Sequence, residues 1–206
     1  HFSVQVTGER PMTYHIASKG PLRLAGIRVP LSGDMEEYQR IIPQFWEKFW
    51  KEVRQGKLNS LLSGRCKLRL SDRALADPGL PGHGLPAACL SHPGSREILG
   101  VSVYDGPGKI FYYIAVAAEG PVPSGLYTLE VPAAAWAIFE NEGGFKTDVQ
   151  DVFRRFYREW LPFSGYEYAG LPDIEVYPLY PLCEEIPANG HSQVWIAIKK
   201  NREDKP

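Results

Sequence analysis

The sequence predicts an α+β domain in which a strand-helix-strand-strand unit occurs twice and builds an antiparallel sheet with two main helices and a central cleft. The first observation is an echo between strand-like segments. Tyr113-Ile-Ala-Val-Ala117 matches Trp195-Ile-Ala-Ile-Lys199, and Gly100-Val-Ser-Val-Tyr-Asp105 matches Asp173-Ile-Glu-Val-Tyr-Pro178. The segments of each pair alternate in hydrophobicity, as β-strands do. Because both strand-like segments occur twice in the same form, the chain is interpreted as a fused duplication.

The second observation is that an amphipathic, helix-like stretch precedes each pair of strands. Phe45-Trp-Glu-Lys-Phe49 in the first half corresponds to Phe156-Tyr-Arg-Glu-Trp160 in the second. A chain of 206 residues is long enough to bury one substantial core. We expect a single domain over residues 1–206, with one half at about 10–117 and the other at about 126–199.

The chain opens with two predicted strands. Phe2 to Val6 alternates strictly, and Leu22 to Val29 does so less strictly, with a turn around Gly20-Pro21 between them.

A helix should follow. Asp34 and Glu37 have the spacing of a capping box, and Pro43 either kinks the helix or marks a restart. The predicted helix ends at Gly56. The buried stripe consists of Met35, Tyr38, Ile42, Phe45 and Phe49.

The segment from 64 to 97 is rich in Gly and Pro, lacks periodicity and has no counterpart in the second half, so we interpret it as an inserted loop. A hairpin over 98–104 and 110–117 follows it, because Gly106 and Gly108 suit a tight turn. A linking strand at 126–131 leads into 134–140.

The second helix opens with Thr147 and Gln150 as another capping box and stops at Pro162. The last two strands are expected at 173–177 and 193–198. The predicted buried stripe of this helix is Val149, Val152, Phe153, Phe156 and Trp160.

Alternation along the strands predicts which side chains line a cleft. Val194, Ile196 and Ile198 should cover the helices, and Ile174 and Val176 should do the same on the neighbouring strand. The opposite face then carries aromatic rings and Glu175. The predicted ligand-binding residues are Glu175, Tyr177, Trp195, Gln193, Tyr113, Phe111 and Tyr104.

Such a surface favours an aromatic or lipophilic ligand, and one buried carboxylate favours a cation. Two alternatives stay open. The rings could extend a core, with Glu175 a solvated carboxylate, because cross-strand aromatic pairs stabilise sheets without a ligand. A buried Glu175 with a raised pKa could also act as a general acid or base.

The composition argues against several other classes. A net charge of −1 gives no overall attraction to a phosphate backbone, so direct DNA binding by this chain is not expected. The odd number of three cysteines fits reduced thiols and a cytoplasmic location, and no apolar run is long enough for a membrane span. No cofactor is expected. His83, Cys89, His92 and Cys66 fit no zinc motif, so we expect no metal site.

Several runs also resemble the GyrI-like effector-binding domain found at the C-terminus of many AraC-type bacterial transcription regulators. The most specific are Glu159-Trp-Leu-Pro-Phe-Ser-Gly-Tyr166 and Pro172-Asp-Ile-Glu-Val-Tyr177. Gly125-Leu-Tyr, Ala135-Trp-Ala-Ile-Phe-Glu140 and Val194-Trp-Ile-Ala-Ile198 add to them.

The resemblance implies a duplicated, SHS2-like fold and a small-molecule effector bound in the central cleft. It implies that Glu175 contacts a lipophilic cation, while Gln193 departs from the family pattern by replacing a second carboxylate. DNA would be contacted only through a helix-turn-helix region that is not in this chain, and homodimer formation stays open. The alternative that the superfamily offers is a small hydrolase acting on strained electrophiles through Glu175.

Overall fold

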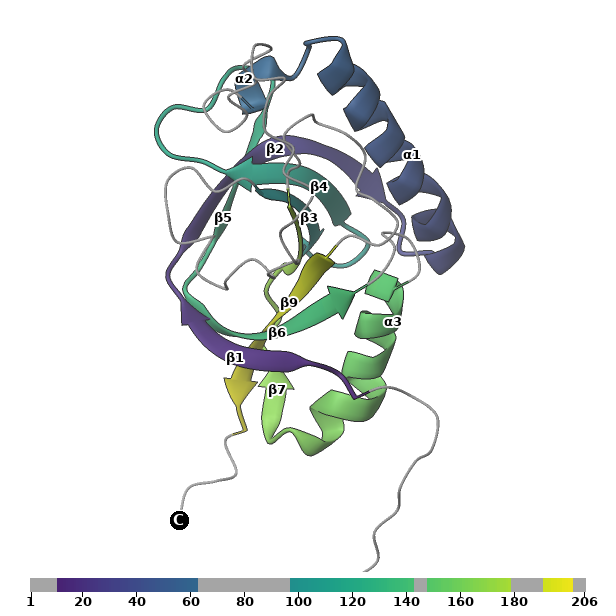
Figure 1. The fold of residues 1–206 in the computed structure, drawn as a ribbon, viewed down its shortest axis with the longest axis vertical. Coiled ribbons are helices and arrows are strands. Elements are labelled where there is room, and N and C mark those ends of the chain that lie inside the picture. The colour runs from purple at the N-terminus through teal and green to yellow at the C-terminus, as the bar shows by residue number, and fades with distance from the viewer. Residues whose placement is uncertain (1–10, 63–96, 143–147, 179–190, 202–206) are drawn as a thin grey trace, which may run out of the picture.

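The computed structural model describes residues 11–62, 97–142, 148–178 and 191–201. Within these residues, one antiparallel sheet carries the two main helices on the same face (Figure 1). The predicted α+β class with an antiparallel sheet and two helices is confirmed. The strands are β1 (Tyr14–Lys19), β2 (Leu22–Leu31), β3 (Glu97–Tyr104), β4 (Ile110–Ala117), β5 (Tyr127–Val131), β6 (Ala134–Glu142), β7 (Tyr166–Tyr168), β8 (Asp173–Pro178) and β9 (His191–Lys200).

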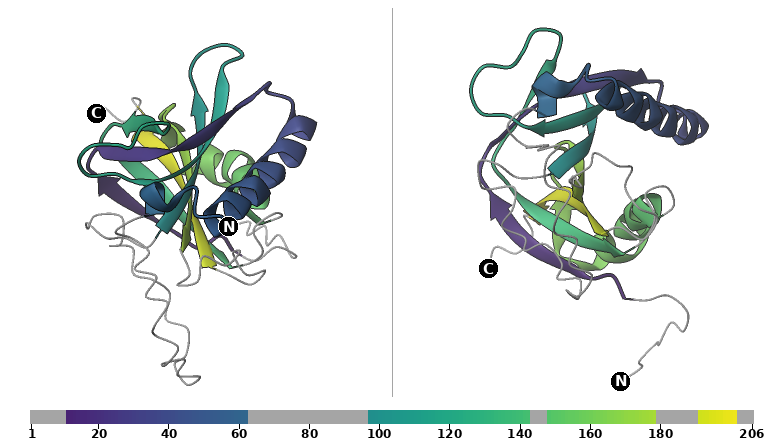
Figure 2. Two further views of the ribbon diagram at one scale, coloured as in Figure 1. Left: turned by 90° about the horizontal axis from the view of Figure 1, so that it is seen from above. Right: turned by 45° about the horizontal axis from the view of Figure 1, so that its top comes forward.

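The order of strands in the sheet explains its strong curvature. The order is β1-β6-β9-β8-β3-β4-β2-β5, with β7 also pairing with β9. β1 therefore lies at one end of the sheet, while β2 lies next to the other end, although only Gly20 and Pro21 separate them in sequence. Two residues cannot span a flat sheet with strands about 4.8 Å apart. The sheet must curl until its ends approach, as Figure 2 shows.

The first helix, α1 (Met35–Arg54), is followed by the short α2 (Asn59–Leu62). Asp34 caps α1 by accepting a hydrogen bond from the Glu36 N–H at 3.0 Å. The Glu37 carboxylate accepts from the Ser32 N–H at 2.7 Å instead of completing a capping box with Asp34. α1 continues through Pro43, so the predicted alternative of a restarted helix is wrong.

The second helix begins as α3 (Asp148–Arg155) and widens into a π-helical turn, η2 (Phe156–Trp160), before the 3-10 turn η3 (Leu161–Phe163). The Leu161 N–H donates to the Phe156 carbonyl, which is the i→i+5 bond of that wide turn. Phe156 and Trp160 are buried, as the predicted stripe requires. Thr147, the predicted cap, lies outside the described residues.

Both faces of the sheet are buried. One apolar cluster lies between the sheet and the helices and includes Trp46, Phe156 and Val194. The other covers the opposite face and includes Trp136 and Trp195. In a sheet that is buried on both sides, apolar residues occupy both odd and even positions of a strand, so apolar character alone does not identify the residues that face the helices.

The prediction missed β1, because it placed the opening strand at Phe2–Val6, which lies outside the described residues, as do residues 64–96 and the four candidate zinc ligands. In the part of the chain that the structure describes, no helix is long and apolar enough to cross a membrane.

Candidate functional site

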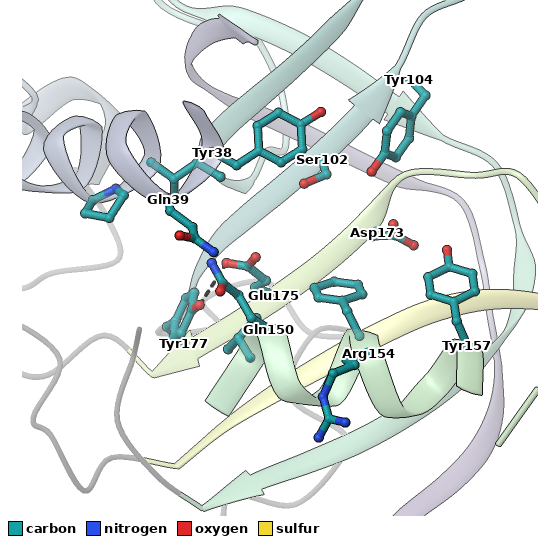
Figure 3. A pocket seen from close by; sticks show the side chains of 14 residues that line it. Tyr38, Gln39, Ser102, Tyr104, Gln150, Arg154, Tyr157, Asp173, Glu175 and Tyr177 are labelled. Carbon is teal, nitrogen blue, oxygen red and sulfur yellow. Dashed lines mark hydrogen bonds between the residues drawn. The ribbon is translucent and has the colours of Figure 1, made fainter. Parts of the chain in front are cut away.

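A cavity of about 720 Å³ lies on the helix face, between α1 on one side and α3 with η2 on the other, over strands β3 and β8 (Figure 3). This volume is in the range of small-molecule sites. Its lining residues are Tyr38, Gln39, Ile42, Pro43, Ser102, Tyr104, Val149, Gln150, Phe153, Arg154, Tyr157, Asp173, Glu175 and Tyr177.

The floor of the pocket is formed where the two halves of the sheet meet. Asp173, Glu175 and Tyr177 alternate along β8 and so share one face. In the antiparallel register with β3, Ser102 lies opposite Asp173, and Gly100 lies opposite Glu175. The strand pair thus brings two carboxylates to the middle of the pocket.

The two helices contribute side chains at matching positions. Tyr38, Gln39, Ile42 and Pro43 lie on α1, and Val149, Gln150, Phe153 and Arg154 repeat the same spacing on α3. Each set combines members of the predicted stripe with the residues that directly follow them. Tyr157 extends the second wall, so that rings from α1, α3, η2, β3 and β8 surround the two acids.

Glu175 is held by a chain of buried aromatic side chains. The Trp46 Nε1–H donates to the Tyr112 hydroxyl at 3.0 Å, and the Tyr112 hydroxyl donates to Glu175 Oε2 at 2.7 Å. The Tyr177 hydroxyl donates to the same oxygen at 2.8 Å (Figure 3). Burial raises the pKa of Glu175, and these two hydroxyl groups offset part of that increase.

Gly100 makes this arrangement sterically possible. A Cβ atom at position 100 would overlap the Tyr112 hydroxyl and lie 2.6 Å from Glu175 Oε2. Only glycine leaves room for the tyrosine and the carboxylate to meet above the β3 backbone.

Asp173, two residues before Glu175, is buried with 4% of its surface exposed. Burial raises the pKa of Asp173 to about 7, the Tyr168 hydroxyl lowers it, and the neighbouring Glu175 charge raises it. Neither acid pairs with a Lys, Arg or His in the described part of the chain. Arg154 lines the cavity, but it forms a salt bridge with Asp151, and Figure 3 shows its guanidinium directed away from the carboxylates. A pocket of this kind can take up a positive charge among rings.

Three of the seven predicted ligand-binding residues, Glu175, Tyr177 and Tyr104, line this pocket. The predicted face is right for β9, where Val194, Ile196 and Ile198 pack against the helices, but it is wrong for β8. Ile174 pairs with Trp195, and Glu175 pairs with Val194, which packs against the helices. Glu175 therefore faces the helices, while Ile174 and Val176 belong to the opposite cluster. The prediction assumed that the aliphatic residues of every strand face the helices, which fails when both faces are buried.

The other four residues lie on the opposite face and contact the protein's own polar groups. Phe111 and Tyr113 surround Arg28, whose Nη1–H donates to the Tyr113 hydroxyl at 2.9 Å. The Trp195 Nε1–H donates to Gln193 Oε1 at 2.9 Å, and Lys19 Nζ lies 5.0 Å from the Trp195 ring centroid. The structure therefore does not bring these four residues together with Glu175.

Sequence reasoning missed most of the helix contribution. Tyr38 and Phe153 appeared only as core positions, and Gln39 was not considered at all. The sequence does contain one indication of this contribution. Gln39 and Gln150 are polar residues at matching positions beside the apolar stripes of the two predicted helices. Nothing in the sequence distinguishes Tyr112, which is adjacent to the predicted Tyr113, from a tyrosine that is simply buried in the core.

The chain matches one known protein family. The family model described as GyrI-like small molecule binding domain matches residues 12–199. Among curated protein sequences, none shows significant similarity to the chain.

Three similar solved structures share the fold at low identity. SAV2435, solved with tetraphenylphosphonium bound, is 17% identical over 91% of this chain and 94% of its own, with a TM-score of 0.63. A putative bacterial transcription regulation protein from Staphylococcus aureus MU50 is 17% identical over 92% and 99%, with a TM-score of 0.60. An integron cassette protein of Vibrio cholerae is 13% identical over 92% and 100%, with a TM-score of 0.54.

Proposed function

The chain belongs to the GyrI-like small molecule binding domain family, and we propose that it is the effector-binding domain of an AraC-type transcription regulator that binds an aromatic or lipophilic cation between α1 and α3. The observation that carries this proposal is the pair of buried carboxylates in a ring-lined cavity, neither of which pairs with a Lys, Arg or His among the described residues. A bound cation would offset the cost of burying their charge.

The proposed ligand-binding residues are those that line the cavity. Glu175 supplies the negative charge, and Tyr38, Tyr104, Phe153, Tyr157 and Tyr177 supply ring faces and edges. The tetraphenylphosphonium bound to SAV2435 is a lipophilic cation of the class expected here. The ligand class assigned to this chain rests on its own charges and rings.

The regulator part of the proposal rests on two supports. The runs at 159–166 and 172–177 resemble the effector-binding domain of AraC-type regulators, and a protein of similar fold is described as a putative transcription regulation protein. Residues from both helices and both central strands line the pocket. A ligand would therefore favour one spacing of the two halves, which would be sensed by a DNA-binding region elsewhere in the regulator.

The test is a calorimetric titration with tetraphenylphosphonium, with uncharged triphenylphosphine oxide as the matched ligand. We expect saturable binding of the cation and much weaker binding of the neutral compound. Glu175→Gln should weaken cation binding roughly 10- to 100-fold, because one nearby charge is lost. Glu140→Gln, on the surface beside Gln193, is the matched control and should leave the affinity unchanged. Equal binding of both compounds would contradict the proposal.

A hydrolase is the second candidate, favoured by one observation. A carboxyl group with a pKa of about 7, such as that of Asp173, is suited to general acid or base catalysis at neutral pH. Incubation with styrene oxide, followed by mass spectrometry, tests it. Hydration that disappears in Asp173→Asn or in Glu175→Gln would support the enzyme, and saturable binding with unchanged compound would support the sensor.

A further inference from the structure

Trp46 reaches the pocket only through another side chain. It lies on α1 with 2% of its surface exposed, and it is not among the residues that line the cavity. Its Nε1–H donates to the Tyr112 hydroxyl at 3.0 Å, and that hydroxyl lies 2.7 Å from Glu175 Oε2. Trp46 is therefore two hydrogen bonds away from the carboxylate that the proposed cation contacts.

The chemistry of the indole group fixes the direction of these two hydrogen bonds. An indole N–H can donate a hydrogen bond but cannot accept one. The Tyr112 hydroxyl is fully buried and has a single proton. Because this hydroxyl accepts from Trp46, its own proton is left for Glu175 Oε2. Tyr112 therefore donates to Glu175 rather than accepting from it.

This direction favours the ionised form of Glu175. An ionised Oε2 accepts from the Tyr112 and Tyr177 hydroxyls together, whereas a proton on that oxygen would compete with both donors. Burial and the Glu175 charge raise the pKa of the Tyr112 hydroxyl, and the Trp46 hydrogen bond lowers it in part. A hydroxyl that receives a hydrogen bond is a stronger donor in the next one.

Trp46 also contacts the second donor. Its ring packs edge-on against the Tyr177 ring, with the ring centroids 5.5 Å apart. One buried indole thus supports both tyrosines that donate to Glu175.

We propose that Trp46 is a positioning residue for Glu175, which directs the Tyr112 proton toward the carboxylate and so keeps it negatively charged before a ligand enters. This inference rests on the proposed function of the same pocket. With the charge already present, a lipophilic cation does not have to displace a proton from Glu175 when it binds.

The first test measures the ionisation of Glu175 without any ligand. A carbon-13 NMR titration follows the Glu175 carboxyl carbon, which is assigned by the loss of its signal in Glu175→Gln. The titration is carried out in Asp173→Asn, because Asp173 is the other acid of the pocket and has a pKa of about 7. The remaining titratable or charged groups that line the pocket are Tyr38 on α1, Tyr104 on β3, Arg154 on α3, Tyr157 on η2 and Tyr177 on β8.

These groups do not titrate in the same range as the carboxyl group, because burial raises the pKa of each of the four tyrosines above its ordinary value and the arginine stays protonated. Trp46→Phe, which keeps a ring but removes the N–H, should raise the pKa of Glu175 by at least about 0.3 units, the size expected when a charge-assisted hydrogen bond loses roughly a fifth of its strength. Tyr112→Phe, which removes the donor itself, should raise it by about 1–2 units.

Two further comparisons separate this role from packing. Trp50→Phe makes the same substitution one turn further along α1, where the buried Trp50 ring stacks on Trp46 but donates to neither Tyr112 nor Glu175 in the described part of the chain. It should leave the pKa of Glu175 unchanged. In a Tyr112→Phe background, Trp46→Phe should have no further effect. If Trp46→Phe fails to fold, benzothienylalanine in place of Trp46 removes the N–H donor with little change in shape.

The second test is the pH profile of tetraphenylphosphonium affinity, measured by calorimetry in Asp173→Asn with and without Trp46→Phe. We expect a loss of at least about 2-fold at the acidic end, the same change as the pKa shift. At the alkaline end, where Glu175 is ionised in both variants, the affinities should be equal. An equal loss at both ends would indicate damage to packing and would overturn the inference.

The outcomes separate the two proposals. An unchanged pKa of Glu175 in Trp46→Phe would overturn the role of Trp46, and so would an increase of the same size in the Tyr112→Phe background. Failure of tetraphenylphosphonium to bind the wild-type domain would overturn the proposed function. The titration of Glu175 in the ligand-free domain would still decide whether Trp46 controls its charge.

Discussion

Two aromatic clusters lie on opposite faces of the same sheet, and they differ in the charge that the chain itself supplies. On the helix face, rings surround Glu175 and Asp173. On the other face, the Arg28 guanidinium carbon lies 4.3 Å from the Phe111 ring centroid and 4.2 Å from that of Tyr127. The second cluster contains a cation, Arg28, in contact with its rings, whereas neither acid of the first cluster pairs with a cationic side chain in the described part of the chain.

The difference shows that aromatic content alone does not identify a ligand site. Rings with an internal cation form a completed cation–π arrangement that has no need of a ligand. Rings with unpaired, buried acids leave an electrostatic cost that a ligand can relieve. The following predictions test whether the two faces differ in this way.

The largest effect is expected from Gly100→Ala. The added methyl group overlaps the Tyr112 hydroxyl and crowds Glu175, so the free energy of unfolding should fall by roughly 3 kcal/mol, with loss of tetraphenylphosphonium binding. Urea denaturation and calorimetry measure the two effects. Ser102→Ala, on the same face of β3, should stay within about 0.5 kcal/mol of wild type. A variant at position 100 with wild-type stability and binding would contradict the described packing.

Adjacent tyrosines on opposite faces allow a paired test. Tyr112→Phe removes a donor to Glu175 and leaves the Trp46 Nε1–H without its acceptor, so we expect a loss of about 2 kcal/mol in unfolding free energy and weaker cation binding. Tyr113→Phe removes only the bond to Arg28 and should cost about 1 kcal/mol without changing cation affinity. Equal effects of both variants on binding would show that the pocket does not depend on Tyr112.

Each face also contains an acid whose pKa is raised by burial, Asp173 on one and Glu97 on the other, both to about 7. Because these pKa values exceed the ordinary ones, the folded state binds more protons than the unfolded state. The contribution of these two acids to stability is therefore greatest at low pH and falls as pH rises from about 4 to 7, by at most about 1.4 kcal/mol per pH unit for each acid.

Asp173→Asn and Glu97→Gln should each reduce this slope in denaturation experiments. Only Asp173→Asn should also change how cation binding varies with pH. Wild-type affinity should increase as pH rises through 7, because the cation prefers the ionised carboxyl. The same pH profile of binding in wild type and Asp173→Asn would show that Asp173 does not titrate with the ligand.

A small effect is expected from Arg28→Ala, on the face opposite the pocket. Loss of the ring stacking and of the Tyr113 bond should lower the free energy of unfolding by about 1 kcal/mol while leaving tetraphenylphosphonium affinity unchanged. Arg23→Ala, which removes an exposed pair with Glu130, should cost less than about 0.5 kcal/mol. A large change in cation affinity in Arg28→Ala would mean that the two clusters are coupled.

Much of the fold follows from local patterns in the sequence. The stripes around Phe49 and Phe156 predicted the two helices, and alternation predicted most strands, because each pattern reflects burial of one side of an element. β1 was missed because Tyr14–Lys19 alternates between half-buried and exposed residues and contains few strong strand formers.

The site was harder to predict because parity divides a strand into two sets without saying which set faces the helices. Ile174 and Val176 look like helix-facing residues, yet they pack against Trp195 on the other side. Glu175 was identified by its charge among apolar neighbours. Its partner Tyr112 depends on pairing between β3, β4 and β8, which no local pattern contains.

Two short links between the ends of the sheet restrict how far its two halves can move relative to each other. Gly20-Pro21 joins β1 to β2, and Pro132-Ala133 joins β5 to β6. Each link connects the β1-β6-β9-β8 half of the sheet to the β3-β4-β2-β5 half. Because both ends are connected, we expect the two halves of the sheet to change their spacing only slightly when a ligand binds, through changes in twist where β3 pairs with β8. Lengthening either link by a few glycines would relax this constraint, and the space between the helices would lose its fixed width.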